Sequence, residues 1–211
     1  LCLPIASKDG SSTYWVDSLF VSTSATCVTG LTVFDTYTHW SLFGQIVVIL
    51  LIQIGGLGVV SFATGFILFL RRKLDLRDLQ IATEYTNGTI MNISKLIKTI
   101  LIWTFTCEFI GVLLLSIRFI PQFGLHGLWI AVFTSISAYC NAGFDIMGFI
   151  QYGCSLIPYF NDPLVTLTIS FLIIIGGIGF IVVSDIYSYL SIKLKNKSSH
   201  PRLSTHSSVV I

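Results

Sequence analysis

One short pattern occurs twice in the sequence, and its residues suit the binding of a cation by the protein backbone. The first copy is SLFVSTSATCVTGL, residues 18–31, and the second is AVFTSISAYCNAGF, residues 131–144, which follows 113 positions later. A short helix ending at TCVTG or YCNAG would present its partly negative C-terminus and the next carbonyl groups to a desolvated cation. Gly30 and Gly143, which close these two segments, permit backbone conformations that a Cβ atom forbids.

The composition indicates that both copies lie in a membrane protein. Hydrophobic residues make up 54% of the 211 residues and charged residues only 10%, which few water-soluble domains of this length tolerate. Residues 42–70 and 164–183 carry no charge, and residues 99–117 carry only that of Glu108. Each run is long enough to cross about 30 Å of hydrocarbon. We therefore predict an all-α, multi-pass membrane protein.

The basic residues predict how these segments are oriented. Of the twelve Lys and Arg residues, six lie between the first two spans and four follow the third. The positive-inside rule places those two connections in the cytoplasm. The N-terminus and both copies of the pattern then lie on the outer side.

The elements that would position the two loops form a repeat. Residues 16–25 and 129–138 are too short to span the bilayer, so each is a candidate re-entrant helix, which is tolerated where it lines a water-filled cavity or is buried in protein. IQIGGLG and IIIGGIG follow inside the spanning runs. Each repeat thus consists of a pore helix, a filter-like loop and an inner helix. The glycines of the inner helices have an alternative role in close helix packing.

TSATCVTGLTVFDT followed by LLIQIGGLG, with SAYCNAGFD and IGGIGF in the second repeat, resembles the Trk/Ktr/HKT superfamily of potassium transporters. The greatest similarity is to the membrane subunit of bacterial Ktr systems. The resemblance implies potassium uptake across the plasma membrane by a pore-forming subunit in which four repeats surround one ion pathway. It also implies a homodimer in membrane lipid, a cytosolic nucleotide-binding regulatory subunit, sodium as a candidate coupling ion, and neither enzymatic activity nor a cofactor.

On this resemblance the chain carries about two of the four repeats, so its two loops alone would not complete the filter. The first repeat covers residues 1–70, with most of its outer helix missing, a pore loop at 16–31 and an inner helix at 41–70. Residues 71–94 form a cytoplasmic connection. The second repeat covers residues 95–192, with an outer helix at 95–120, a pore loop at 129–144 and an inner helix at 163–190. Residues 193–211 would be a cytoplasmic link and the start of a third repeat.

The resemblance also assigns the potassium filter to ten positions. These are Thr26, Cys27, Val28, Thr29, Gly30, Tyr139, Cys140, Asn141, Ala142 and Gly143. The side chains of the first four could contact the ion or pack behind the carbonyl groups.

Three acidic residues are further candidates. Asp35 and Asp145 follow the two loops and could concentrate cations at the outer mouth; alternatively, they are solvated loop residues. Glu108 lies about ten residues from either charged end of its segment, near the bilayer centre. An intramembrane carboxylate suggests a function, and the alternative is a structural partner on a neighbouring helix.

Other classes of function find little support. The five cysteines lack CxxC spacing and the four histidines are scattered, which argues against a metal site or a hydrolase. Basic and aromatic residues are not interleaved as in a nucleic-acid-binding protein. The remaining alternative is a non-conducting accessory or scaffold subunit of another ion-transport complex.

Overall fold

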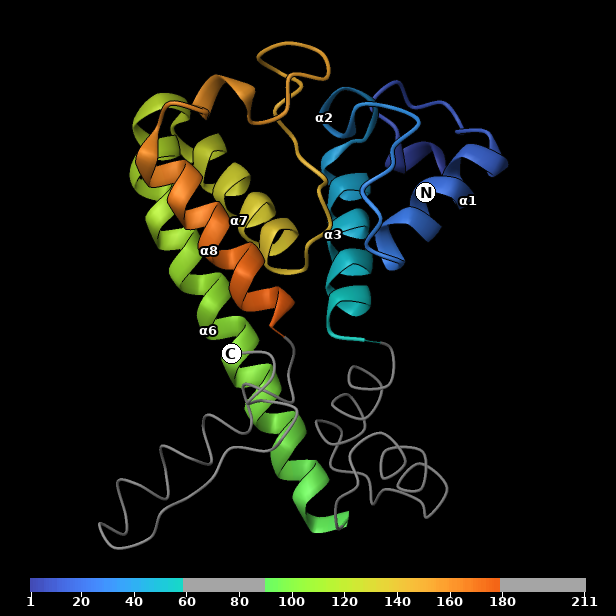
Figure 1. The fold of residues 1–211 in the computed structure, drawn as a ribbon. Helices are drawn as coiled ribbons and strands as arrows, with labels where there is room; N and C mark the ends of the chain where they lie inside the picture. Colours follow the sequence, from blue (N-terminus) through green and yellow to red (C-terminus); the bar gives the residue numbers. More distant parts are fainter. Residues whose placement is uncertain (59–89, 179–211) are drawn as a thin grey trace, which may run out of the picture. The chain divides into compact units, whose positions relative to one another are not determined.

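The computed structural model describes residues 1–58 and 90–178, without the side chains of 90–97, and its regular structure in these ranges is helical (Figure 1). No β-strand occurs there; Ser7 and Trp40 form one isolated bridge. The elements in chain order are η1 (Pro4–Ala6), α1 (Trp15–Thr26), α2 (Thr36–His39), α3 (Leu42–Gly56), α6 (Ile90–Phe123), α7 (Leu125–Tyr139), η2 (Ile157–Tyr159) and α8 (Pro163–Gly177).

The chain forms two compact units. The first comprises Leu1–Val59 and Phe105–Gly176, and the second comprises Val60–Thr104 and Gly177–Ile211. The described part of the second unit consists mainly of the N-terminal stretch of α6. Both copies of the repeated pattern belong to the first unit, so the candidate site can be described within it.

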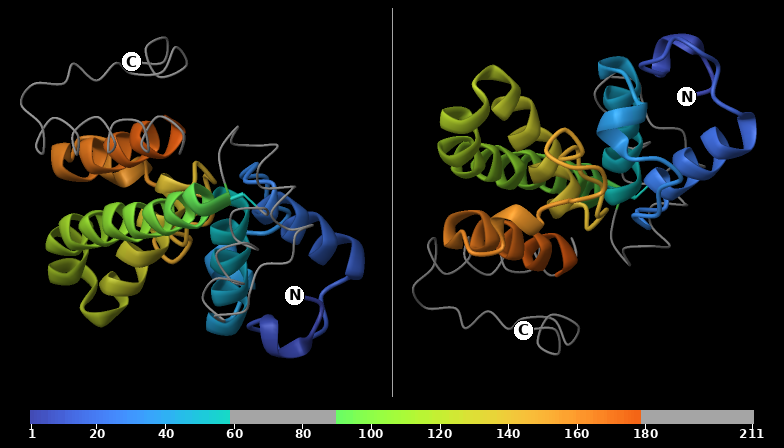
Figure 2. Two further views of the ribbon diagram at one scale, coloured as in Figure 1. Left: turned by 90° about the horizontal axis from the view of Figure 1, so that it is seen from below. Right: turned by 90° about the horizontal axis from the view of Figure 1, so that it is seen from above.

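Helix α3 lies centrally among the contacts of the first unit. It packs against α1, α7 and η1, and Figures 1 and 2 show α1 and α3 side by side. Elsewhere in this unit, Gly111 of α6 lies against Ser135 of α7 and Leu172 of α8. The largest fully buried side chains include Trp40 and Phe133. Their burial removes large apolar surfaces from water and stabilises this arrangement.

Helix α6 is the element long and apolar enough to cross a membrane. Among the described residues, Lys98–Phe123 meets this criterion, and Leu42–Gly56, Leu125–Tyr139 and Pro163–Gly177 are shorter apolar helices. Large apolar side chains along the first unit's part of α6 are exposed, and they include Phe105, Phe109, Ile110, Leu113 and Ile117. An apolar surface of this extent marks contact with a membrane or with another protein.

The helix bounds can be compared with those expected from the sequence. The outer helix predicted at 95–120 lies within α6, which begins five residues earlier, inside the segment predicted as the cytoplasmic connection 71–94. Helices α3 and α8 lie within the predicted inner helices. Residues 59–70 and 179–190 of those predictions, residues 71–89 of the connection and the link at 193–211 lie outside the described residues.

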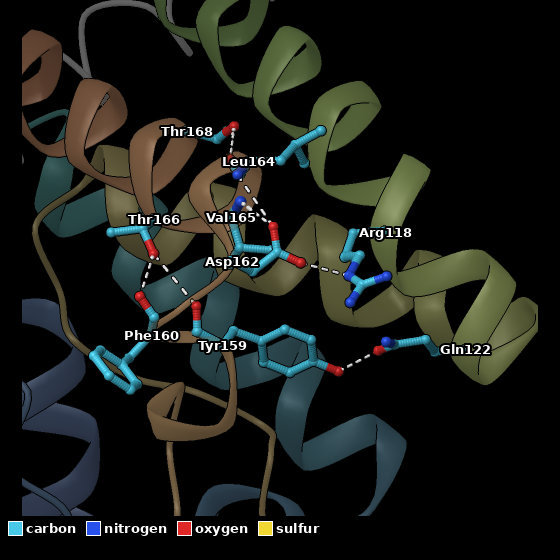
Figure 3. A network of polar contacts seen from close by, with 9 residues as sticks. All are labelled: Arg118, Gln122, Tyr159, Phe160, Asp162, Leu164, Val165, Thr166 and Thr168. Atoms are coloured by element: carbon cyan, nitrogen blue, oxygen red, sulfur yellow. Dashed lines mark hydrogen bonds and ion pairs between the residues drawn. The ribbon is translucent and has the colours of Figure 1, made fainter.

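A polar network fixes the start of α8 to the end of α6 (Figure 3). Asp162 accepts hydrogen bonds from the amides of Leu164 and Val165, at 3.1 and 3.4 Å, which caps the helix N-terminus. Its other carboxylate oxygen forms an ion pair with Arg118 of α6. The start of α8 is therefore held both by its own cap and by a neighbouring helix.

Candidate ion-binding loops

The loop after α1, residues 26–30, continues the helix into a tight hydrogen-bonded turn. The amide of Val28 donates to the carbonyl of Ala25 at 3.3 Å, and the amide of Thr29 donates to the carbonyl of Ser24 at 3.0 Å. This pair of bonds is the Schellman pattern that ends many helices. We call residues 26–30 the first loop.

The loop after α7, residues 139–143, repeats this turn 113 positions later. The amide of Asn141 donates to the carbonyl of Ala138 at 3.0 Å, and the amide of Ala142 donates to the carbonyl of Ser137 at 2.8 Å. We call residues 139–143 the second loop. The two copies of the sequence pattern therefore have the same local hydrogen bonding.

The backbone dihedral angles of the two loops also agree. Val28 and Asn141 have φ values of 56° and 59°, and Gly30 and Gly143 have φ values of 76° and 74°. Glycine adopts this left-handed region readily and asparagine tolerates it, whereas a β-branched valine there is strained. The sequence predicts special backbone conformations at the two glycines but not the positive φ of Val28 and Asn141, although an asparagine just after a helix is a known signal for this turn.

The turn leaves carbonyl groups free in both loops. Those of residues 27–30 and 140–143 accept no hydrogen bond from any of the described residues. Most backbone carbonyl groups in folded proteins have a partner. A row of unpaired carbonyl groups beside a helix C-terminus has the chemistry needed to replace the water shell of a cation.

The two loops meet at their glycines. A Cβ atom on Gly30 would lie 2.6 Å from the carbonyl oxygen of Ala142 and 3.6 Å from the Cα atom of Gly143. Only glycine permits this approach, because any side chain would collide with the facing backbone. The fold thus brings together two segments that are far apart in the sequence.

The glycines of the inner helices hold each loop closely. A Cβ atom on Gly55 of α3 would collide with the carbonyl of Thr26, and one on Gly176 of α8 would collide with the carbonyl of Tyr139. The two contacted carbonyl groups, those of Thr26 and Tyr139, occupy matching positions in the repeated sequence pattern. The geometry therefore supports the close-packing role of these glycines.

The cysteines that follow these carbonyls differ in their surroundings. Cys140 is buried against Gly56 of α3, whereas Cys27 is exposed. Among the described residues, no group of three or more His, Cys, Asp or Glu side chains could hold a metal ion. Cys140 thus serves here as a small packing residue.

Two serine side chains form hydrogen bonds with the backbone just beyond the loops. Ser24 Oγ accepts a hydrogen bond from the amide of Leu31 at 3.0 Å, whereas Ser137 Oγ donates to the carbonyl of Phe144 at 2.6 Å. The serines occupy matching positions in the repeated pattern but use opposite hydrogen-bonding roles. Their matching positions are visible in the sequence, but their hydrogen bonds are not.

The two outer acids have different environments. A cavity of about 260 Å³ is lined by both loop glycines, Asp35 and Asp145, among other residues. Asp35 caps α2 through one carboxylate oxygen, and its other oxygen accepts from the amide of Gly153 at 3.1 Å. Asp145 accepts a hydrogen bond from the amide of Met147. Asp35 therefore has a structural role, and Asp145 is the less constrained of the two carboxylates.

Glu108 is buried away from that cavity. Its side chain accepts a hydrogen bond from Gln53 Nε2 of α3 at 2.8 Å, and its backbone carbonyl accepts one from Ser135 Oγ of α7. The structure thus supplies the neighbouring-helix partner that the structural alternative for Glu108 required.

Comparison with known proteins identifies the family. Residues 3–206 match the TrkH family, described as a cation transport protein. The chain is 41% identical over 205 residues to the Ktr system potassium uptake protein B of Bacillus subtilis; the match covers 96% of this chain and 44% of the relative. It is 40% identical over 195 residues to the potassium/sodium uptake protein NtpJ of Enterococcus hirae, covering 92% and 42% respectively.

A third relative agrees with these two. The chain is 38% identical over 191 residues to the Ktr system potassium uptake protein B of Vibrio alginolyticus, covering 90% of this chain and 40% of the relative. The chain thus spans about two fifths of the length of the relatives it matches. The expected membership of the Trk/Ktr superfamily is confirmed: the chain belongs to the TrkH family of cation transport proteins.

Proposed function

We propose that this chain is part of the pore-forming membrane subunit of a potassium-uptake transporter of the Ktr or Trk type. The observation that carries the proposal is the contact between two loops of matching conformation whose carbonyl groups at residues 27–30 and 140–143 have no hydrogen-bond partner among the described residues. Its chemical basis is that carbonyl oxygens can replace the hydration shell of potassium without any covalent chemistry.

The proposed filter consists of backbone rather than side-chain oxygens. The hydroxyl group of Thr26 donates a hydrogen bond to the carbonyl of Ser22 at 2.8 Å, and the hydroxyl groups of Thr29 and Ser24 share one at 2.8 Å. These side chains are already engaged within the first repeat. We therefore assign ion contact to the carbonyl groups and a supporting role to the threonine side chains.

The complete pathway in this proposal requires more than the two loops. A potassium ion held by half a ring of oxygens keeps too few ligands to offset the loss of its water. We propose that two further repeats complete the ring in the longer protein. We also propose the two-repeat division of the chain and its multi-pass topology, which rest on the repeated motifs, the apolar runs and the basic residues. The family resemblance supports, in addition, a homodimer and a cytosolic nucleotide-binding regulatory subunit.

The filter assignment can be tested with Gly30→Ser and Gly143→Ser in the longer protein. Both are expected to reduce potassium uptake, or the preference for potassium over sodium. A Cβ atom at Gly30 would collide with the carbonyl oxygen of Ala142, and a side chain at Gly143 would strain the left-handed backbone of the second loop. Gly10→Ser is the matched control, since Gly10 also has a positive φ, of 67°, but a Cβ atom added there would have no other atom within 4 Å.

The assay is potassium and sodium uptake in a bacterium that lacks its own potassium uptake, followed by ion flux in liposomes that contain the purified protein. Unchanged uptake and cation preference in both loop variants would contradict the filter assignment. An absence of flux from correctly folded wild-type protein with its regulator would favour the non-conducting accessory subunit.

A further inference from the structure

A buried pair of side chains joins α3 to α6. Gln53 Nε2 donates a hydrogen bond to Glu108 Oε1 at 2.8 Å. The two side chains belong to residues that are only 9% and 4% exposed. This polar contact lies between two largely apolar helices, and neither residue belongs to the proposed filter.

The pair lacks a hydrogen-bond donor. Gln53 Oε1 is buried and has no hydrogen-bond partner among the described residues. A buried amide oxygen without a donor is costly. The amide of Gln53 can itself donate only through its nitrogen. A hydrogen-bond donor to Gln53 Oε1 therefore has to come from another group.

The part of the chain that the structure describes also places no positive charge beside the pair. The ion pair found in the described residues is Arg118–Asp162, which does not involve Glu108. The titratable groups that interact with Glu108 are the thiols of Cys107, on the same helix, and Cys140, on the second loop. Gln53 from α3 and Ser135 from α7 contribute no charge. With respect to the described residues, an ionised Glu108 would therefore be a buried carboxylate without a neighbouring cation, which is strongly unfavourable.

A proton bound to Glu108 would both provide the hydrogen-bond donor and remove the negative charge. A protonated carboxyl group is neutral and has one O–H donor and one carbonyl acceptor. Glu108 Oε1 accepts from Gln53 Nε2, and the hydroxyl group on the other carboxyl oxygen can donate to Gln53 Oε1. The two planar groups then form two hydrogen bonds, and neither retains an unsatisfied atom.

We propose that Glu108 is a proton-binding site, and that its bound proton closes a two-bond acid–amide pair with Gln53. The pair joins α3 to α6 two and three residues before Gly55 and Gly56, which contact the first and second loops. Release of the proton would remove one hydrogen bond and place an unpaired charge between the helices. The site does not depend on the proposed ion conduction, because its chemistry is confined to these two side chains.

Infrared spectroscopy of the longer protein in lipid at neutral pH tests this proposal directly. The expected signal is the C=O stretch of a protonated carboxyl group, which shifts when water is exchanged for D₂O. The signal should be absent from Glu108→Gln and unchanged in Asp9→Asn, which removes an exposed acid. Gln53→Leu should move the signal to higher frequency, because the acid loses its hydrogen-bond partner.

A swap of the two residues keeps the test decisive if a single variant fails to fold. The double variant Gln53→Glu and Glu108→Gln restores one acid and one amide at the same place, so the protonated-carboxyl signal should return. Absence of the signal from the folded wild-type protein at neutral pH would overturn the proposal, as would a signal that persists in Glu108→Gln.

Unfolding provides a second measurement. Glutamate is ionised at neutral pH in an unfolded chain, so a folded protein that retains this proton binds more protons than the unfolded one. Stability should then fall as the pH rises through the neutral range, with a smaller slope in Glu108→Gln. Equal slopes in the two proteins would also contradict the proposal.

Discussion

The contact between the two loops makes Gly30→Ala the most informative single substitution in the proposed site. A Cβ atom at Gly30 would lie 2.6 Å from the carbonyl oxygen of Ala142. That atom belongs to the backbone, so no side-chain rotation can relieve the collision. Gly30 also has a φ of 76°, which disfavours alanine independently of the collision. The substitution should therefore separate the loops as well as strain the first one.

The two costs can be estimated separately. Placing alanine in the left-handed region costs about 1–2 kcal/mol, and forcing an additional methyl group into a packed contact costs about 1–3 kcal/mol. Gly30→Ala should thus destabilise the fold by about 2–5 kcal/mol, the sum of these two terms. Gly10→Ala should show only the first term, because Gly10 has a φ of 67° and a Cβ atom added there would have no other atom within 4 Å.

The assay is denaturant unfolding of the purified longer protein in one detergent, with both variants compared to the wild type. The difference between the two variants isolates the contact between the loops, and we expect it to be about 1–3 kcal/mol. If Gly30→Ala is no more destabilising than Gly10→Ala, then the loops do not meet at their glycines and the geometric basis of the proposed site is wrong.

Three further predictions concern the second loop, the cap of α8 and a histidine of α2. Asn141→Val should destabilise the protein by about 1–2 kcal/mol because it introduces valine in the left-handed region; a neutral effect on unfolding would show that this turn is not formed. Asp162→Ala should lower the free energy of unfolding by about 1 kcal/mol through loss of the α8 cap, and the half-exposed ion pair with Arg118 should add little. Asp162→Asn should retain the cap. Equal losses of stability in both variants would refute this separation of cap and ion pair. Burial lowers the pKa of His39 below its ordinary value of 6.5, and its ring hydrogen-bonds to Thr13. The contribution of neutral His39 to the free energy of unfolding is therefore complete above pH 6.5. It should be lost as the pH falls through the lower pKa of the folded state. His39→Gln should remove this part of the acid sensitivity, and identical melting profiles over that pH range would contradict it.

The repeated sequence pattern predicted the pair of loops because it records local structure. A short apolar helix, a turn and a glycine recur with the same spacing, and the hydrogen bonds of both turns join residues no more than five positions apart. Such short-range bonds depend mainly on the local sequence. The left-handed conformation of Val28 is the exception, because valine does not favour it. It can be recognised only from the matching position, where Asn141 has the same conformation.

Contacts between distant segments could not be derived in the same way. Glu108 was recognisable as an intramembrane acid, but its partner Gln53 lies 55 positions earlier, and only the tertiary fold brings the two side chains together. Asp35 is a similar case, since one carboxylate oxygen binds the amide of Gly153, which is 118 positions away. A residue's type shows which bonds it can form, whereas the fold determines which of those bonds it does form.

Helix α3 shows why the two loops cannot be positioned independently. Its neighbouring glycines, Gly55 and Gly56, face the carbonyl of Thr26 in the first loop and the side chain of Cys140 in the second. Successive residues on a helix point about 100° apart, so two adjacent glycines place two different faces of α3 against the two loops. A shift of α3 along its axis would disturb both contacts at once. Contacts of one helix with both loops therefore help to fix the distance between them, as required if their carbonyl groups are to act on one ion.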